Sequence, residues 1–291
     1  MLPYFPFTGE PYEPSMGLKS LDLATWIEPD AAQGDQLRLK ADLLVRERDL
    51  VFRAPDDTGP ACRELYLLLA DHLPRQHPAF YRQEDGLLHV LSTGRTFPLQ
   101  PREDASADDL LSSVALWIQE DLCLLSAAPP AKIVAGSVCF PSRWNLPEKF
   151  GLDAPAVHAP VPGFSRSLAK PTAHFLDRIT VDKPVWRLNW TLHDSDTLFA
   201  PHPVPGRTDL TEATVLSAVH LRVERQTLRR LPATGAVVFT IRTHLTPLAE
   251  VIAHPERRRL LHATLAGLPA EVTAYKGMAT FIKPLLAVTK V

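Results

Sequence analysis

The clearest pattern in this chain is a strict alternation of polar and apolar residues between positions 185 and 193. The polar residues fall on one parity and the large apolar residues on the other: Arg187, Asn189 and Thr191 against Trp186, Leu188, Trp190 and Leu192. Successive side chains of a β-strand point to opposite faces, so a period of two is typical of a strand with two unlike faces. We therefore predict a strand over 185–193 with one polar face.

Further strands are predicted on both sides of this one. Residues 215–228 and 236–245 form an antiparallel pair around a turn at 231–235, which ends in Gly235. Shorter apolar runs bounded by turn residues predict the remaining strands: two within 87–99 around Ser92-Thr93-Gly94, one at 122–125 and one at 133–140.

Helices are predicted where apolar residues recur at intervals of three and four. Pro60 is expected in the first turn of one helix, Asp108 or Asp109 is expected to cap another, and Pro171 is expected to interrupt a third. The predicted helical ranges are 30–50, 60–73, 108–118, 163–179, 255–268 and a C-terminal segment over 275–286.

Together these elements predict an α+β fold, an antiparallel sheet with flanking helices. We expect one domain over residues 1–291. It has an extended N-terminal arm and helical layer over about 1–85, and C-terminal helices over about 255–291. The first 25 residues alternate prolines with aromatic residues, which predicts an arm lying extended against the body.

One histidine stands in a segment of unusual composition, residues 141–163. Pro155, Pro160 and Pro162 surround His158, and proline fixes φ and lacks a backbone donor. The segment is therefore predicted to be a shaped loop, neither an ordinary helix nor a central strand. A rigid loop that presents an imidazole suits a metal or haem ligand. The alternative is that His158 only caps or packs a turn.

Charge and cysteine content narrow the function classes. With 31 Lys and Arg against 33 Asp and Glu, the chain has no net positive field to attract nucleic acid, and the short basic runs at 229–230 and 256–259 are expected to be solvated faces. The three cysteines show neither a CxxC pair nor a zinc pattern, which fits a reducing cytosol. No apolar stretch approaches the length of a membrane span, and no signal peptide is recognised. We expect a cytoplasmic protein.

Several motifs occur together along the chain: PSRWNLPEKFG, VHAPVPGF, RLNW, RVERQTLRRLP and FTIRT. In this order they resemble the alpha-subunit family of haem-dependent oxidative N-demethylases, over most of the chain. The resemblance implies a fold similar to PAS sensor domains, in which an antiparallel sheet closed by helices holds a b-type haem with a histidine as proximal ligand. It also implies an enzyme that oxidises dimethylamine with O2 and releases formaldehyde. Its electrons would come from NADPH through partner subunits that carry FMN and a [2Fe-2S] centre.

His158 is our predicted axial ligand of the haem iron, framed by apolar residues that include Phe164. His174, His193 and His220 are the alternatives. Arg143 and Arg166 flank the loop and are candidates for holding the haem propionates, because a guanidinium fork can bind a carboxylate through two hydrogen bonds. Both could equally be surface arginines. Trp144 is a further candidate haem contact, although a core position is the commoner role for such a residue.

On the other side of the iron, bound O2 and an amine need polar groups in a dry site. Arg187 and Asn189 share one face of their strand, and Glu224 and Gln226 share a face of the next, so Arg187, Asn189 and Glu224 are the predicted catalytic residues. A structural ion pair between Arg187 and Glu224 is the alternative. Carboxylates at 120 and 121 are also available to hold a cationic amine.

Two other functions remain open from the sequence. A haem-based gas or redox sensor would keep the cofactor without turnover, and a small-molecule binding protein would keep only the fold. No GxGxxG or P-loop string accompanies the strands, so an enzyme would need a separate reductase partner.

Overall fold

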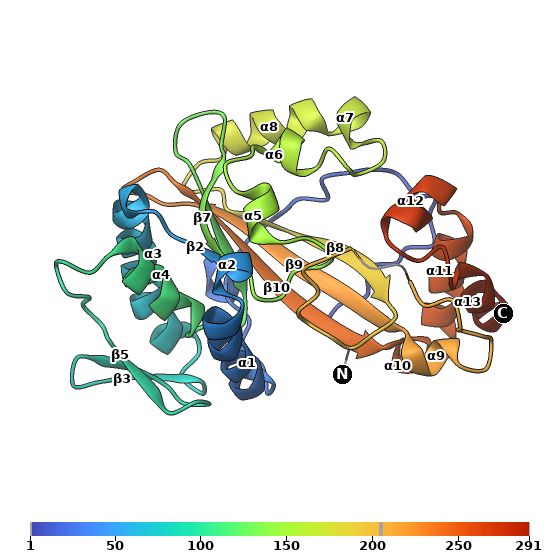
Figure 1. Cartoon of the computed structure of the whole chain (residues 1–291), viewed down its shortest axis with the longest axis horizontal. Helices are drawn as coiled ribbons and strands as arrows, with labels where there is room; N and C mark the ends of the chain where they lie inside the picture. The colour runs from blue at the N-terminus through green and yellow to red at the C-terminus, as the bar shows by residue number, and fades with distance from the viewer. Residues whose placement is uncertain (1, 204–205, 291) are drawn as a thin grey trace.

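A seven-stranded antiparallel sheet forms the centre of the protein, which a computed structural model describes over residues 2–203 and 206–290. The strand order is β1-β8-β9-β10-β6-β7-β2 (Figure 1). The strands span β1 (Lys19–Ser20), β2 (Phe52–Arg53), β6 (Asp121–Leu125), β7 (Ile133–Ser137), β8 (Val185–His193), β9 (His220–Arg230) and β10 (Val237–Pro247). The α+β class predicted from the sequence is confirmed.

The long strands β8, β9 and β10 make an antiparallel meander, as the alternation predicts. Asn189 is paired with Glu224 and Arg187 with Gln226 across β8 and β9. These four side chains therefore share one face of the sheet, which we call the site face. The other parity, with Trp186, Leu188, Trp190, Arg225 and Thr227, forms the opposite face.

Four short helices connect β7 to β8 and cover the site face: α5 (Leu146–Lys149), α6 (Ala154–Val157), α7 (Phe164–Ser167) and α8 (Ala169–Arg178) (Figure 1). They pack on the sheet through one apolar cluster. It includes Cys123, Leu125, Leu146, Leu176, Ile179 and Val237.

The predicted loop at 141–163 is partly wrong, because α5 and α6 are single helical turns within it. Pro147 and Pro155 each stand in the first turn, where a missing N–H removes no helical hydrogen bond. The predicted helix over 163–179 is divided at Leu168 rather than at Pro171. A proline ring clashes with the carbonyl four residues before it, so Pro171 is accommodated in the first turn of a new helix.

The N-terminal part forms a layer at the end of the sheet near β2 (Figure 1). Pro60 lies in the first turn of its helix, as predicted. The predicted cap at Asp108 or Asp109 is wrong: Ser106 is the N-cap, and Asp109 completes a capping box with it. This layer comprises η1 (Leu23–Thr25), α1 (Gln33–Arg46), α2 (Arg48–Val51), η2 (Asp56–Thr58), α3 (Gly59–Gln76), α4 (Ala107–Ala115) and a small sheet of β3 (Tyr81–Glu84), β4 (Leu87–Val90) and β5 (Arg95–Pro98).

The C-terminal helices lie at the other end of the sheet (Figure 1). Residues 215–218 were predicted to open a strand but form a helical turn, since a short apolar run fits either structure. The predicted helix over 275–286 is confirmed only from Ile282 onward, because the chain turns at Gly277, whose φ is 70°. This end comprises α9 (Val215–Ala218), α10 (Leu248–Ile252), α11 (Pro255–Ala266), α12 (Ala270–Tyr275) and α13 (Ile282–Thr289).

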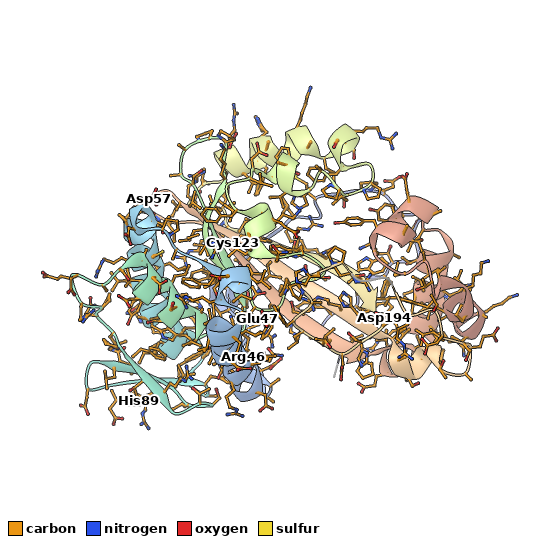
Figure 2. The ribbon with its side chains drawn as sticks, in the orientation of Figure 1. Arg46, Glu47, Asp57, His89, Cys123 and Asp194 are labelled. Carbon is orange, nitrogen blue, oxygen red and sulfur yellow. The ribbon has the colours of Figure 1, made fainter. Side chains whose placement is uncertain are left out.

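The N-terminal arm runs along the sheet and fastens to it through aromatic rings. Phe7 packs edge to face on Trp190, with ring centroids 4.7 Å apart, and Tyr4 packs near Trp186. Within the described residues, no helix is both long and apolar enough to cross a membrane. All three cysteines are free and buried; Cys123 projects from β6 in the interior (Figure 2), where burial raises the pKa of its thiol to about 12.

Candidate functional site

His158 ends the single turn α6 and is held in one orientation. Asp153 caps the turn by accepting a hydrogen bond from the Ala156 N–H at 3.0 Å. The imidazole Nδ1 lies 2.8 Å from the carbonyl oxygen of Ala154. A carbonyl only accepts, so Nδ1 must carry the proton and Nε2 of the neutral ring keeps its lone pair. This is the arrangement that orients metal-binding histidines in general.

The surroundings of His158 keep its ring neutral. Its imidazole stacks on Phe164, with centroids 4.8 Å apart and an interplanar angle of 19°. Burial lowers the pKa of His158, and the positive charges of Arg187 and Lys149 lower it further, while the bond to Ala154 opposes the shift. The ring is therefore a neutral donor at physiological pH, which is the form that binds iron.

A polar cluster lies on the site face around one carboxylate. Glu224 accepts hydrogen bonds from the amides of Asn189, at 3.2 Å, and Gln226, at 3.0 Å. Arg222 Nε lies 3.4 Å from the other carboxylate oxygen, and both of these side chains are buried. Three donors thus hold the Glu224 side chain fixed in position.

Arg187 belongs to the same row but has fewer hydrogen-bond partners. It lies diagonally across from Glu224 on the neighbouring strand, but Glu224 forms its ion pair with Arg222. Arg187 Nε is buried and has no hydrogen-bond partner among the described residues. Burial lowers the pKa of its guanidinium, and the nearby charges of Glu224 and Tyr12 oppose that shift.

Three further residues reach this site from distant segments, and sequence reasoning missed them. Tyr12 comes from the N-terminal arm, and Tyr275 and Lys276 come from the end of α12. Burial raises the pKa of both tyrosines, with Arg187 acting on Tyr12 and Glu224 on Tyr275. Burial also lowers the pKa of Lys276 to about 8, and Arg187 lowers it too, against the attraction of Glu224. The prolines and aromatics of the arm were the one available signal for Tyr12.

The structure does not gather all the predicted cofactor residues at one point. Phe164 contacts His158 directly, whereas Trp144 is half-buried and packs on the apolar cluster beneath α5–α8. Arg166 is exposed on α7. Arg143 donates a hydrogen bond to the Lys276 carbonyl at 3.3 Å and pairs with Asp194 at 3.4 Å.

The alternative ligands and carboxylates have other surroundings. His174 is exposed on α8, and His193 is buried with its Nε2 3.0 Å from Ser142 Oγ. His220 is paired with His193 across the sheet. Two buried carboxylates serve the protein's own backbone: Glu120 accepts from the Glu28 N–H, and Asp121 accepts from Cys139 and Phe140.

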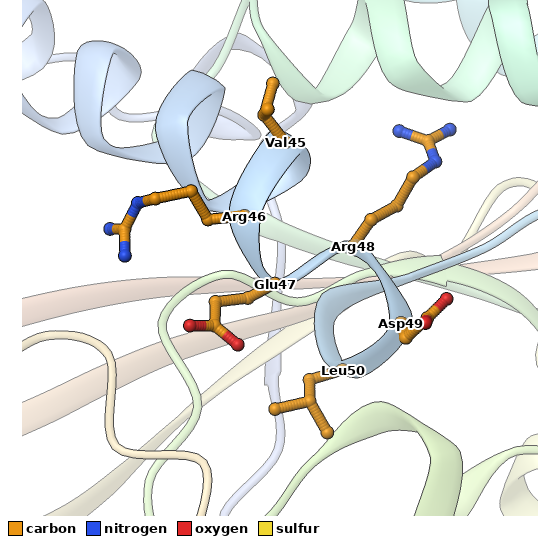
Figure 3. Close-up of a pocket in the computed structure, with 6 residues that line it drawn as sticks. All are labelled: Val45, Arg46, Glu47, Arg48, Asp49 and Leu50. Carbon is orange, nitrogen blue, oxygen red and sulfur yellow. The ribbon is translucent and has the colours of Figure 1, made fainter.

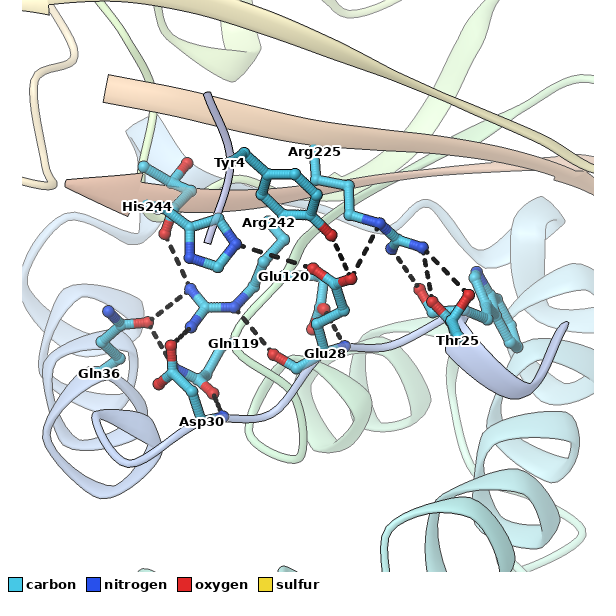
Figure 4. Close-up of polar contacts among 12 residues, drawn as sticks. Tyr4, Thr25, Glu28, Asp30, Gln36, Gln119, Glu120, Arg225, Arg242 and His244 are labelled. Carbon is cyan, nitrogen blue, oxygen red and sulfur yellow. Dashed lines mark hydrogen bonds and ion pairs between the residues drawn. The ribbon is translucent and has the colours of Figure 1, made fainter. Parts of the chain in front are cut away.

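A cavity of about 910 Å³ lies elsewhere, beside β10 beyond the last residue paired with β6. Its polar groups hold the segment Thr25–Asp30 against the sheet (Figure 4). Arg242 donates to the Glu28 carbonyl and pairs with Asp30 at 2.6 Å, and Arg225 donates to the Thr25 and Trp26 carbonyls. Most guanidinium donors near this cavity already form hydrogen bonds to the 25–30 segment. His244 Nε2 is buried and lies 3.7 Å from the Glu28 carboxylate.

A second, smaller cavity of about 250 Å³ lies at the joint between α1 and α2. It is lined by residues 45–50, whose side chains point in several directions (Figure 3). None of the predicted site residues lines this cavity, so it is separate from the polar cluster on the site face.

The fold and the site define a class: an α+β protein in which a helical layer over one face of an antiparallel sheet holds an oriented imidazole, and the same face carries a buried carboxylate. Residues 17–286 match the family described as haem-dependent oxidative N-demethylase, alpha subunit-like. The match covers nearly the whole chain, and the chain belongs to this family.

Proposed function

We propose that this protein is a haem-dependent oxidoreductase that removes a methyl group from a small secondary amine such as dimethylamine. The family name supports haem and an N-demethylase-like activity. The observation that carries the proposal is the orientation of His158: its Nδ1–H donates a hydrogen bond to the Ala154 carbonyl, and its Nε2 lone pair is left for a metal.

The residues present fit a b-type haem. His158 supplies the strong axial ligand that haem iron requires, and Phe164 and the apolar cluster under α5–α8 supply apolar surface near it. An antiparallel sheet with one face closed by helices inserted between β7 and β8 also supports the PAS-like fold that we propose. The unpartnered Nε of Arg187 is a buried donor that an added group could satisfy.

When bound, haem supplies the O2 binding and electron transfer that the protein's side chains cannot perform. The chain's own task is to place the amine and handle protons. Glu224, fixed by Asn189, Gln226 and Arg222, can accept a hydrogen bond from the amine N–H and so orient the methyl group. The buried surroundings of Glu224 strengthen this interaction by excluding water.

The proposed reaction balances with one external reductant. A secondary N-methyl amine, one O2, two electrons and two protons give the primary amine, formaldehyde and water; the N–CH3 bond is broken and O2 is reduced. We propose that the electrons come from NADPH through partner subunits carrying FMN and a [2Fe-2S] centre. The words "alpha subunit-like" in the family description support such partners.

Turnover separates this proposal from a sensor or a binding protein. The haem-loaded protein, given dimethylamine, O2 and a reducing system, is expected to release formaldehyde in proportion to methylamine. Glu224→Gln keeps the volume but loses the charge, so we expect kcat/KM to fall by about 100-fold, the size of a lost charged contact in a dry site. Glu250→Gln, an exposed residue at the other cavity, is the matched control and should leave turnover unchanged. A haem spectrum without formaldehyde would contradict the enzyme and favour the sensor.

A further inference from the structure

Two cations near the site face have no ion pair of their own among the described residues. Glu224 forms its ion pair with Arg222. Two more cations, Arg187 and Lys276, act on the same carboxylate electrostatically, and neither forms a salt bridge within residues 2–203 and 206–290. Arg222 is also attracted by Asp121, whereas Arg187 and Lys276 are two cations of this site that form no ion pair among the described residues.

Arg187 is the clearer case. Its side chain is half-buried, and its Nε is buried with no hydrogen-bond partner in the described structure. Burying a cation without an anion is unfavourable, and native structures retain such groups where a ligand or partner compensates them. The natural complement of a guanidinium fork is a carboxylate or phosphate.

Lys276 has the same unfilled capacity. Its ammonium donates to the Trp190 carbonyl and lies 4.5 Å from the centroid of the Trp190 ring. An ammonium has three donors, so this hydrogen bond leaves capacity for an anion. Burial lowers the pKa of Lys276, and the charge of Arg187 lowers it too, as expected for a poorly solvated cation beside another cation.

The arginines that the sequence suggested for an anion are less suitable. Arg143 is already engaged with Asp194 and the Lys276 carbonyl, and its guanidinium packs on Gly277, where a Cβ would lie 1.1 Å from Nη1. Arg166 is exposed on α7, where a contact with a carboxylate would be screened by solvent.

We infer that Arg187 and Lys276 bind the two propionate carboxylates of the haem, in place of Arg143 and Arg166. The inference rests on the proposed function, because it takes haem as the ligand. It reassigns Arg187 from O2 chemistry to cofactor binding and leaves Asn189 and Glu224 to the substrate. Two propionates would give each of these two cations an anion of its own.

Comparison of haem with its dimethyl ester tests the inference, because the ester keeps the porphyrin and iron but has no propionate charge. The apoprotein is titrated with each, and binding is followed by the Soret band. The wild type should bind haem about 100-fold more tightly than the ester, from two charge-assisted contacts of about tenfold each. Arg187→Gln and Lys276→Met should each weaken haem binding by about tenfold and leave ester binding unchanged.

The controls separate charge from folding. Arg187→Lys keeps the charge and should retain most of the preference for haem, while Arg166→Gln should retain all of it. Equal weakening for haem and ester, no weakening, or loss of the preference in Arg143→Gln would overturn the inference. A wild type that binds both porphyrins equally would overturn it and leave the proposed function standing. Failure to bind either porphyrin would overturn the proposed function itself.

Discussion

Replacing Gly277 by alanine should dislodge Arg143 from the connection between α12 and α13. Gly277 has a φ of 70°, in the left-handed region that L-residues with a Cβ rarely adopt. An added Cβ would lie 1.1 Å from Arg143 Nη1 and 2.4 Å from its Cζ. Both atoms belong to a guanidinium held by Asp194 and the Lys276 carbonyl, so the side chain must leave these partners.

The expected cost has two parts. Placing alanine in the left-handed region costs about 1–2 kcal/mol. Losing the hydrogen bonds of a largely buried charged group costs about 1.5–3 kcal/mol more. Gly277→Ala should therefore lower the free energy of unfolding by about 2.5–5 kcal/mol, measured by urea denaturation with a linear extrapolation.

Two further variants separate these parts. Gly86 has a similar φ of 75° with no atom within 4 Å of an added Cβ, so Gly86→Ala should show the backbone cost alone. In Arg143→Ala the clashing group is absent, so adding Gly277→Ala to it should cost clearly less than in the wild type. The reasoning fails if Gly277→Ala costs no more than Gly86→Ala, or if the two substitutions at 143 and 277 are additive.

Three more outcomes follow from the described contacts. Burial, with Arg222 and Arg143 nearby, lowers the pKa of His193 to about 3, so between pH 6 and 4 the unfolded state binds one more proton than the folded state and the free energy of unfolding decreases as the pH is lowered. His193→Gln should reduce the slope of the urea-derived free energy of unfolding against pH by about 1.4 kcal/mol per pH unit in this range. An unchanged slope would contradict this. Lys40→Met should cost about 3–5 kcal/mol in the same assay, because fully buried Lys40 donates to two carbonyls and lies 4.0 Å from Asp121; a neutral effect would show that this charge is dispensable. Ser106→Ala should cost about 1 kcal/mol through loss of the capping box of α4, and no change on urea unfolding would show that the cap is redundant.

The main sheet could be predicted because its strands carry their own local signal. The alternation over 185–193 gives both the bounds of β8 and the shared face of Arg187 and Asn189, and the turn at 231–235 fixes the register of β9 and β10. The alternation could not show where β9 begins, because residues 215–218 bury apolar side chains equally well in a helical turn. Single turns such as α6 are also too short to show a helical period.

The candidate site is also only partly visible in the sequence. His158 and Glu224 are proposed as site residues from their immediate sequence and strand parity. Tyr12 and Lys276 could not, because they reach the site from opposite ends of the chain and only the tertiary fold brings them near Arg187. The position of the Arg143 side chain could not be predicted either. Its guanidinium packs on Gly277, and the missing Cβ of this distant glycine matters only in the folded structure.

The central claim is that His158 binds the haem iron, and haem titration of a cavity variant tests it most directly. His158→Gly should lose the Soret spectrum of the wild-type complex, and added imidazole should restore it by occupying the vacated space. His174→Gly, on the exposed surface of α8, and His244→Gly, at the 910 Å³ cavity, should bind haem as the wild type does. An unchanged spectrum in His158→Gly, or loss of haem in His244→Gly instead, would contradict the account.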